Sequence, residues 1–369
     1  MAVIGQCAGD RHRSFPRLRL ARPTASAPGA GIAAADFTAG AGIEIVVARG
    51  AEIELVVDGL GSVVAVAPAP IVALAAGDMD GDAQADFIAA TATEVHVWPV
   101  VAGVVSPTSI VQQVIGVTSF GLGDRSGDGF VDVFALAGDA VVMLPGAIGM
   151  PLGATETIVF SGVRSFAAFD ADSDGRTDIA WSQDTFLRVV DADGSTYELG
   201  NSESSVVESL LPADFSGDAI VDLVAVGLDP SPMATVTGPV LNNYPIVTPQ
   251  ADAIADAAAG AVDGGGFADL ALALGGSGVV RVRFGRQGIV GEFGKSEPFG
   301  CVSDYASGIV ADQVVLADTV GDGTVDIVVS SIRAAILAVN GELGRSTPQP
   351  RLTAACGLPL GSSETMSSR

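Results

Sequence analysis

The sequence predicts an all-β fold, a seven-bladed β-propeller of four-stranded antiparallel blades. Its apolar residues come in short runs such as IEIVVA, DVFALA and DIVVSS, bounded by Gly, Pro and Asp. Such runs are typical of strands and not of long amphipathic helices. A loop of the form D-x-D-x-D-G-x-x-D recurs seven times, at steps of 42 to 57 residues with a mean of 47. A period near 40 to 50 residues is typical of propellers and solenoids.

The seven copies, called the first to seventh loops, have nine places each. The second and fourth loops keep Asp at places one, three, five and nine, and the others keep fewer. Between loops the order strand, loop, strand, turn, strand and variable segment repeats. A fourth strand in the variable segment completes one propeller blade per repeat. The loops span residues 36–44, 78–86, 124–132, 170–178, 214–222, 261–269 and 318–326.

This repeat resembles the FG-GAP/VCBS family of propellers, found in integrin α-chains and in many secreted bacterial proteins. The resemblance covers roughly residues 32–355. It implies that each Asp loop joins the first two strands of a blade and that calcium loops gather on one face. Other calcium loops fit less well. An EF-hand would need Glu where Trp181 stands, and the GGGFAD of 264–269 lacks the tandem copies of RTX repeats.

Crowded carboxylates predict a cation, because two charges 4 Å apart repel by about 4 kcal/mol near a protein surface. Ca²⁺ takes six to eight oxygen ligands, here from side chains at places one, three, five and nine and the carbonyl at place seven. Glycine at place six permits the sharp turn. The expected ligands are Asp78, Asp80, Asp82, Gln84 and Asp86; Asp124, Ser126, Asp128, Phe130 and Asp132; Asp170, Asp172, Asp174, Arg176 and Asp178; Asp214, Ser216, Asp218, Ile220 and Asp222; and Asp318, Asp322, Thr324 and Asp326.

The first and sixth loops, the two copies that depart most from the pattern, are expected to hold no metal. The first loop lacks a carboxylate at Gly40, and the sixth lacks one at Ala261 and Gly265. In these two the acids are expected to form Asx-turns that cap tight hairpins, and this alternative stays open for the other loops. The chain is therefore expected to hold about two to five Ca²⁺ ions. A further DADG at 191–194 lies out of register and is expected to turn a hairpin between outer strands.

Charge and motifs exclude several classes of function. With 43 acidic and 18 basic residues the net charge is −25, which disfavours nucleic acid as a partner. No run of 18 apolar residues occurs, so membrane insertion is not expected. G-x-S-x-G, HExxH and phosphate-loop motifs are absent, and an enzyme is not expected. A carbohydrate-active enzyme would have only three tyrosines to use. His96 alternates with valines in a strand and is expected at the surface or in a groove.

The function expected from these features is an extracellular or cell-surface recognition and adhesion module, although no signal peptide is seen in this chain. A protein or glycan ligand would bind the face opposite the calcium loops. The segments 227–245 and 285–308 depart from the repeat and are candidates for that face. A lectin propeller and a structural module of a larger surface or secreted assembly are the alternatives.

The ends of the chain are expected to lie outside the repeat. Residues 1–22 form an N-terminal arm, 23–355 the propeller, and 356–369 a flexible C-terminal tail. Within the arm, FPRLRLA (15–21) alternates like a strand and is expected to join the last blade and close the ring. Cys301 and Cys356 can pair in an exported protein or remain unpaired.

Overall fold

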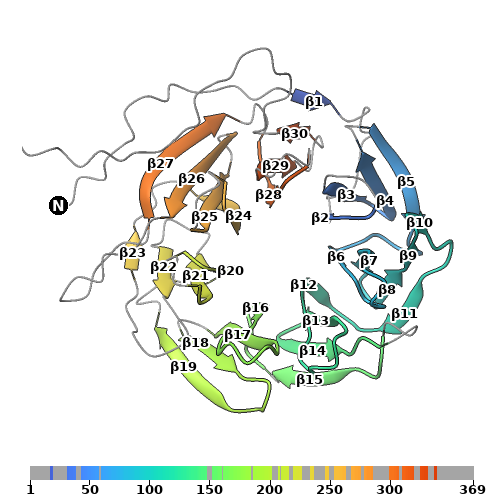
Figure 1. Cartoon of the computed structure of the whole chain (residues 1–369), viewed down its shortest axis with the longest axis horizontal. Helices are drawn as coiled ribbons and strands as arrows, with labels where there is room; N and C mark the ends of the chain where they lie inside the picture. The colour runs from blue at the N-terminus through green and yellow to red at the C-terminus, as the bar shows by residue number, and fades with distance from the viewer. Residues whose placement is uncertain are drawn as a thin grey trace, which may run out of the picture.

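The computed structural model is built entirely of β-strands in the part of the chain it describes, and no helix there is long and apolar enough to cross a membrane. The strands form small sheets arranged around a central axis (Figure 1). The described residues are 17–19, 31–38, 43–57, 60–147, 152–159, 161–183, 186–201, 207, 209–215, 219–226, 233–236, 246–248, 253–262, 267–275, 278–285, 299–306, 310–319, 325–330 and 336–338.

Six four-stranded antiparallel sheets, the first to sixth blades, follow one another around the ring (Figure 1). In every blade the strand nearest the axis comes first in the chain, and the others follow outward. The blades are β2 (Gly31–Ala35), β3 (Glu44–Arg49), β4 (Glu52–Val57), β5 (Leu60–Val66); β6 (Ala73–Gly77), β7 (Asp86–Ala90), β8 (Glu94–Trp98), β11 (Ile110–Gln113); β12 (Val117–Gly123), β13 (Asp132–Ala137), β14 (Ala140–Leu144), β15 (Glu156–Val159); β16 (Ser165–Phe169), β17 (Asp178–Gln183), β18 (Phe186–Val190), β19 (Thr196–Asn201); β20 (Ser209–Ala213), β21 (Asp222–Val226), β22 (Met233–Val236), β23 (Ile246–Thr248); and β24 (Ile254–Gly260), β25 (Asp269–Leu274), β26 (Val279–Gly285), β27 (Phe299–Ala306).

The remaining strands form three pairs. A hairpin of β28 (Gln313–Ala317) and β29 (Asp326–Ser330) lies between the sixth and first blades (Figure 1). Next to it, β30 (Ile336–Ala338) pairs with β1 (Arg17–Arg19), which lies within the N-terminal segment expected to form a strand. A short hairpin of β9 (Val100–Val101) and β10 (Val104–Val105) follows β8, and the sequence pattern did not predict it.

Apolar clusters fill the gaps between neighbouring blades, which explains the apolar strands of the sequence. The second strand of each blade packs on both faces, so β7, β13, β21 and β25 carry apolar runs that are buried throughout or nearly so. The last gap joins the two ends of the repeat, because Ala317 and Val328 pack against Ile45 and Val47 of the first blade. The hydrophobic contacts therefore run around the whole ring.

The innermost strands are rich in Ala and Gly because they converge near the axis. A Cβ added to Gly121 of β12 would lie 2.9 Å from the Phe166 ring of the next blade, and one on Gly77 would lie 2.8 Å from Leu122. Larger side chains at these positions would push neighbouring blades apart.

The segments 227–245 and 285–308 each contain a regular blade strand, so the expectation that they depart from the repeat was partly wrong. Residues 227–245 include β22 of the fifth blade, and 285–308 include β27 of the sixth. Pro and Gly around these strands hide the alternation that would have predicted them. The rest of both segments apart from Gly285, and the whole predicted C-terminal tail (356–369), lie outside the described residues.

A carboxylate joins the innermost strands of the sixth blade and the β28–β29 hairpin. Asp256 of β24 accepts a hydrogen bond from the Val314 N–H at 2.9 Å, across 58 residues of chain. Asp256 follows an irregularity in the register of β24 with β25, and it lies at the start of the strand, away from the Asp loop. Burial raises the pKa of Asp256 to about 6, against the two backbone hydrogen bonds that lower it.

This contact predicts a pH dependence of stability. Because the folded-state pKa of Asp256 lies above its unfolded value of 3.8, the folded chain binds the extra proton between these values. The free energy of unfolding should therefore fall as the pH rises from about 4 to about 6. Urea unfolding of chelator-treated protein across this range checks it, with Asp256→Asn as the comparison. The Asn variant keeps an acceptor for Val314 and should show a flatter profile, whereas identical profiles would refute the assignment.

Candidate metal centres

Six of the seven Asp loops join the innermost strand of a blade to the strand beside it, and the seventh joins β28 to β29. The strand ends that flank these loops therefore lie at one end of the sheets. In each loop the acid at place nine is the first residue of the strand that follows the loop. The seven acids are Glu44, Asp86, Asp132, Asp178, Asp222, Asp269 and Asp326. The loops predicted from sequence are thus brought to a common face of the ring.

The acid at place nine is buried and holds two backbone segments together. In the third loop Asp132 is fully buried. Its Oδ2 accepts the Arg125 N–H at 2.9 Å, and its Oδ1 accepts the Gly146 N–H at 2.8 Å. The first donor belongs to the loop and the second follows the third strand of the blade. One carboxylate therefore fixes the loop to the far end of the adjacent hairpin.

The same pair of hydrogen bonds recurs around the ring. Asp86 accepts from Met79 and Val100, Asp178 from Ala171 and Ala192, and Asp269 from Val262 and Gly285, all at 2.7–3.0 Å. The sequence interpretation gave Asp86, Asp132 and Asp178 a ligand role and did not predict these backbone bonds, so it was incomplete. The first and sixth loops separate the backbone-holding role of this acid from a ligand role. Glu44 of the first loop still accepts the Phe37 N–H at 2.9 Å, and Asp269 of the sixth keeps both bonds. The acid at place nine persists in both loops, although each keeps only one other acid.

Burial perturbs these carboxylates. It raises the pKa of Asp86 to about 6 and raises the pKa of Asp132 and Asp178, while the backbone N–H groups oppose the shift. The buried charge is partly compensated by hydrogen bonds. Each carboxylate oxygen has a second lone pair, so the N–H bonds leave room for a cation.

Acids at place one cap their own loops. Asp78 accepts the Gly81 N–H at 2.8 Å on Oδ1 and the Ala83 N–H at 2.8 Å on Oδ2. Asp124 and Asp170 accept equivalent bonds. The Asx-turns weighed as an alternative are therefore present in loops that also carry the full set of acids. Capping and metal binding are compatible, because the N–H groups use only part of each carboxylate.

Two loops bring three carboxylates together in the way a cation site requires. Oxygens of Asp78, Asp80 and Asp86 lie within 4.8 Å of one another in the second loop. In the fourth loop, oxygens of Asp170, Asp172 and Asp178 do the same. Burial and repulsion from Asp82 and Asp78 raise the pKa of Asp80. These are places one, three and nine, as the sequence predicted.

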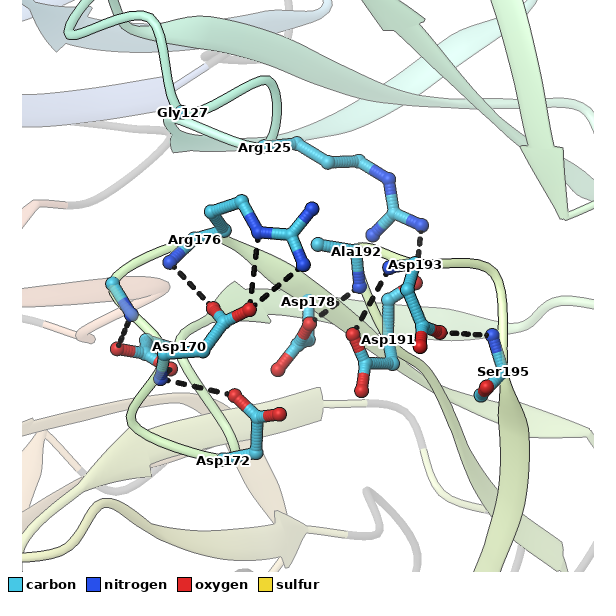
Figure 2. Close-up of polar contacts among 12 residues, drawn as sticks. Arg125, Gly127, Asp170, Asp172, Arg176, Asp178, Asp191, Ala192, Asp193 and Ser195 are labelled. Carbon is cyan, nitrogen blue, oxygen red and sulfur yellow. Dashed lines mark hydrogen bonds and ion pairs between the residues drawn. The ribbon is translucent and has the colours of Figure 1, made fainter.

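Place five is not part of these sets. Asp82 accepts the Gln84 N–H at 2.9 Å. Asp174 accepts the Arg176 N–H at 2.8 Å and pairs with its guanidinium through Nε at 3.0 Å and Nη2 at 2.8 Å (Figure 2). These bonds to Arg176 lower the pKa of Asp174. The arginine whose carbonyl was expected as a ligand thus also supplies a competing positive charge.

The third loop is described in full, whereas the first, fifth, sixth and seventh loops are described only in part. In the third loop the Ser126 hydroxyl lies 3.3 Å from Asp124 Oδ1, and the described acids of that loop form no cluster of three. In the fifth, Asp214 accepts the Ala219 N–H and Asp222 accepts the Phe215 N–H, both at 2.9 Å. In the seventh, Asp326 accepts the Thr319 N–H at 3.0 Å. Ser216, Asp218, Asp322 and Thr324 lie outside the described residues, as do 39–42 and 263–266.

The out-of-register turn at 191–194 joins β18 to β19, as expected, but it also reaches the fourth loop. Asp191 places a carboxylate oxygen within 4.8 Å of oxygens of Asp172 and Asp174 (Figure 2). The pKa of Asp172 is raised, by burial first and then by repulsion from Asp174 and Asp191. The sequence gave no sign of this meeting, because the turn begins 13 residues beyond the end of the loop it contacts, at residue 191 against residue 178.

Arg125 is the residue that sequence reasoning missed. It occupies place two of the third loop, where the other described loops carry apolar or small residues. Its buried guanidinium crosses to the fourth blade and donates to the carbonyls of Thr177 at 3.1 Å and Val190 at 3.4 Å. It also donates to the carbonyl of Asp191 at 2.5 Å (Figure 2). Asp178 and Asp191 are the nearest charges that offset the cost of its burial. A single charged residue among apolar or small equivalents was the available signal.

Neighbouring loops are also joined through the backbone. The carbonyl at place one of a loop accepts the N–H at place eight of the next loop. The pairs are Asp36 with Ala85 (3.1 Å), Asp124 with Thr177 (2.8 Å), Asp214 with Ala268 (2.7 Å) and Asp318 with Ile43 (2.9 Å). The last pair joins the seventh loop to the first.

His96 is a core residue, so its expected place at the surface was wrong. It is 2 % exposed and stacks on Trp98, with ring centroids 5.4 Å apart. Its Nδ1 lies 3.0 Å from the Ser109 hydroxyl and its Nε2 lies 3.4 Å from a Glu94 oxygen. Burial lowers the pKa of His96. Alternation with valines gave no clue, because both faces of β8 pack against neighbouring blades.

No family model matches the chain, and no curated protein is similar to it. Among solved structures it is similar to BBS1N, seen in a mercury-soaked crystal of its complex with ARL6DN. The TM-score is 0.58 and the identity 10%, over 85% of this chain and 91% of that chain. The chain is a β-propeller. At this identity the likeness shows the fold alone.

The buried acid at place nine predicts a large stability effect that needs no metal. Asp132→Ala removes the acceptor of two buried N–H groups, each costing about 1–3 kcal/mol when left unpaired. We expect a loss of about 2–4 kcal/mol in the free energy of unfolding in excess chelator. Asp128→Ala, an exposed acid of the same loop, is the matched control and should change it by less than about 0.5 kcal/mol. Equal effects would show that Asp132 holds nothing in place.

Backbone strain at place six predicts a stabilising substitution. Ala83 has a φ of 68°, where the third and fourth loops have Gly129 and Gly175 with φ of 89° and 87°. A left-handed conformation costs a non-glycine residue about 1–2 kcal/mol, partly offset by glycine's greater unfolded-state entropy. Ala83→Gly should therefore raise the free energy of unfolding by about 0.5–1 kcal/mol. The reverse change, Gly175→Ala, meets no atom within 4 Å of its new Cβ and should lower it similarly by strain alone. Denaturant titration of both variants decides this.

Proposed function

We propose that the chain is a seven-bladed propeller stabilised by Ca²⁺, which serves as an extracellular or cell-surface recognition and adhesion module. The observation that carries this proposal is the meeting of three carboxylates in each of two Asp loops on one face. An arrangement of this kind is self-repelling without a cation.

The ligands of the second and fourth loops suit Ca²⁺ chemically. Asp78, Asp80 and Asp86 would hold an ion in the second loop, with Gln84 as a carbonyl donor. Asp170, Asp172 and Asp178 would do so in the fourth, with the Arg176 carbonyl. An all-oxygen set in a flexible loop favours Ca²⁺ over Mg²⁺, which demands near-octahedral geometry and retains several waters. The bound ion would supply positive charge that offsets the crowded carboxylates. Asp174 would join it only after releasing Arg176.

The seventh blade is proposed to consist of β28, β29, β30 and β1. The pairings β28–β29 and β1–β30 support it, as does the apolar cluster shared by the hairpin and the first blade. The hydrogen bond between Asp318 and Ile43 also joins the seventh loop to the first. A last blade built from both ends of the chain closes the ring and removes exposed sheet edges.

The FG-GAP/VCBS resemblance and the recognition role are inferred from the same features. The placement of each Asp loop between the first two strands of its blade supports the resemblance. Recognition of a protein or glycan on the face away from the loops is supported by the small number of catalytic side chains, since one of two histidines is packed in the core. The similar structure, BBS1N, was crystallised with a protein partner. We propose no enzymatic activity, no nucleic-acid partner and no membrane insertion.

Calcium binding predicts a change in thermal stability. After EDTA treatment and dialysis, Ca²⁺ should raise the melting temperature by at least about 5 °C, since each site filled at 100 times its Kd adds about 2.7 kcal/mol. Mg²⁺ at the same concentration should raise it much less. The double variant Asp80→Ala/Asp172→Ala should lose most of the shift.

The control for charge is Glu52→Ala/Glu156→Ala, which removes two exposed acids outside the loops. It should keep the full calcium response. A melting temperature that does not move across the titration would remove both the metal assignment and the argument for an extracellular location.

A further inference from the structure

The third and fourth loops meet at a single peptide unit. Thr177, at place eight of the fourth loop, donates its N–H to the Asp124 carbonyl at 2.8 Å. Its own carbonyl accepts Nη1 of Arg125 at 3.1 Å. Residues at places one and two of the third loop thus hold Thr177 by both of its backbone groups.

This contact sets the direction of a proposed metal ligand. The Thr177 N–H and the Arg176 carbonyl belong to one planar peptide, and the described chain contains no cis peptide. In a trans peptide these two groups point in opposite directions. Turning the N–H toward the third loop therefore turns the Arg176 carbonyl away from it. That carbonyl is at place seven, the backbone ligand of the fourth loop.

Arg125 makes a second connection to the same site. Its Nη2 donates to the Asp191 carbonyl at 2.5 Å, and the next residue, Ala192, donates its N–H to Asp178 Oδ1 at 2.8 Å (Figure 2). The guanidinium therefore fixes the turn that holds the buried carboxylate of the fourth loop. The Arg125 N–H is itself held by Asp132, the corresponding carboxylate of the third loop.

We propose that Ca²⁺ binding at the third and fourth loops is coupled, so that an ion in either loop raises the affinity of the other. The proposal rests on calcium binding at these loops. In the third loop Asp124, Asp128 and Asp132 form no cluster of three, so the ion would have to draw the Asp128 carboxylate in from its bond to the Phe130 N–H. An ion at Asp124 orders the main chain from which the Asp124 carbonyl and Arg125 reach Thr177. The Arg176 carbonyl is then already oriented when the second ion arrives. Coupling of binding is reciprocal, so the effect works in both directions.

The second and third loops provide a natural comparison. Both loops are fully described, and no backbone hydrogen bond joins Asp78 to Val131, the pair that corresponds to Asp124 and Thr177. Met79 stands at place two of the second loop, where the third loop has Arg125, and it is fully buried. The coupling should therefore be strong between the third and fourth loops and weak between the second and third.

The experiment is a calorimetric titration of the EDTA-treated full chain with CaCl₂. In a background that leaves only the third and fourth loops intact, disabling the third loop with Asp128→Ala should weaken binding at the fourth at least about five-fold. A background with only the second and third loops intact should show a change below about two-fold. The backgrounds are Asp80→Ala/Asp218→Ala/Asp322→Ala for the first case and Asp172→Ala/Asp218→Ala/Asp322→Ala for the second.

Arg125→Met tests whether the coupling passes through the guanidinium, since methionine occupies place two in the second loop. It should reduce the five-fold effect of Asp128→Ala to below about two-fold. The positive charge of Arg125 also repels the ions directly. This repulsion cancels in the comparison, because the titrations with and without Asp128→Ala are made with the same residue at position 125. Arg125→Lys, which keeps the charge and loses the planar fork, should give the same reduction if the Met variant does not fold.

Three results would overturn the proposal, and they differ from one another. A fourth-loop affinity unchanged by Asp128→Ala removes the coupling but leaves calcium binding intact. A full effect that survives in both Arg125 variants removes the route through the guanidinium. Absence of calcium heat in the unmodified chain removes the proposed metal sites, and the coupling with them.

Discussion

The fold depends on a buried carboxylate that begins the second strand of every blade. A carboxylate can accept at both oxygens, so one side chain satisfies backbone N–H groups of two separate segments, as Asp86 and Asp178 do. Those segments come from a turn and from the end of a hairpin, where the sheet ladder offers no partner. Without the acid, buried N–H groups would be left unpaired in every repeat. This requirement explains why the ninth place is acidic in all seven loops, including the first and sixth, which keep only one further acid each.

Around this carboxylate the blades are held by two further kinds of contact. Apolar clusters fill the gaps, and the small residues of the innermost strands, such as Gly121 and Gly77, let adjacent blades approach. Backbone bonds then join one Asp loop to the next, including Asp318 to Ile43. These contacts lie between residues far apart in sequence but adjacent in the ring. A repeat protein gains most of its stability from such interfaces between neighbours, so no blade is expected to fold alone.

The sequence predicted the repeat, the strands and the acids that meet in the second and fourth loops, because each depends on local pattern and regular spacing. It could not predict what crosses from one blade to the next. Arg125 and Asp191 lie 66 positions apart, and only the ring brings the guanidinium to that carbonyl. The burial of His96 and the dual role of Asp132 are likewise consequences of packing. Strands β22 and β27 were obscured by the Pro and Gly around them, whereas the fold that surrounds them imposes a strand at that place in each blade.

The separation of the two roles within a loop bears on what the proposed ions do. The first and sixth loops have lost carboxylates expected as ligands, yet their blades keep the buried acid and the four-stranded sheet. A blade therefore closes without a complete metal site. Ions in the second and fourth loops would then act mainly on the exposed part of a framework that is already formed. They would neutralise and order one face, while the apolar gaps and the place-nine acids maintain the ring. On this argument the proposed calcium ions would set the charge and rigidity of the loop face, and the propeller would form without them.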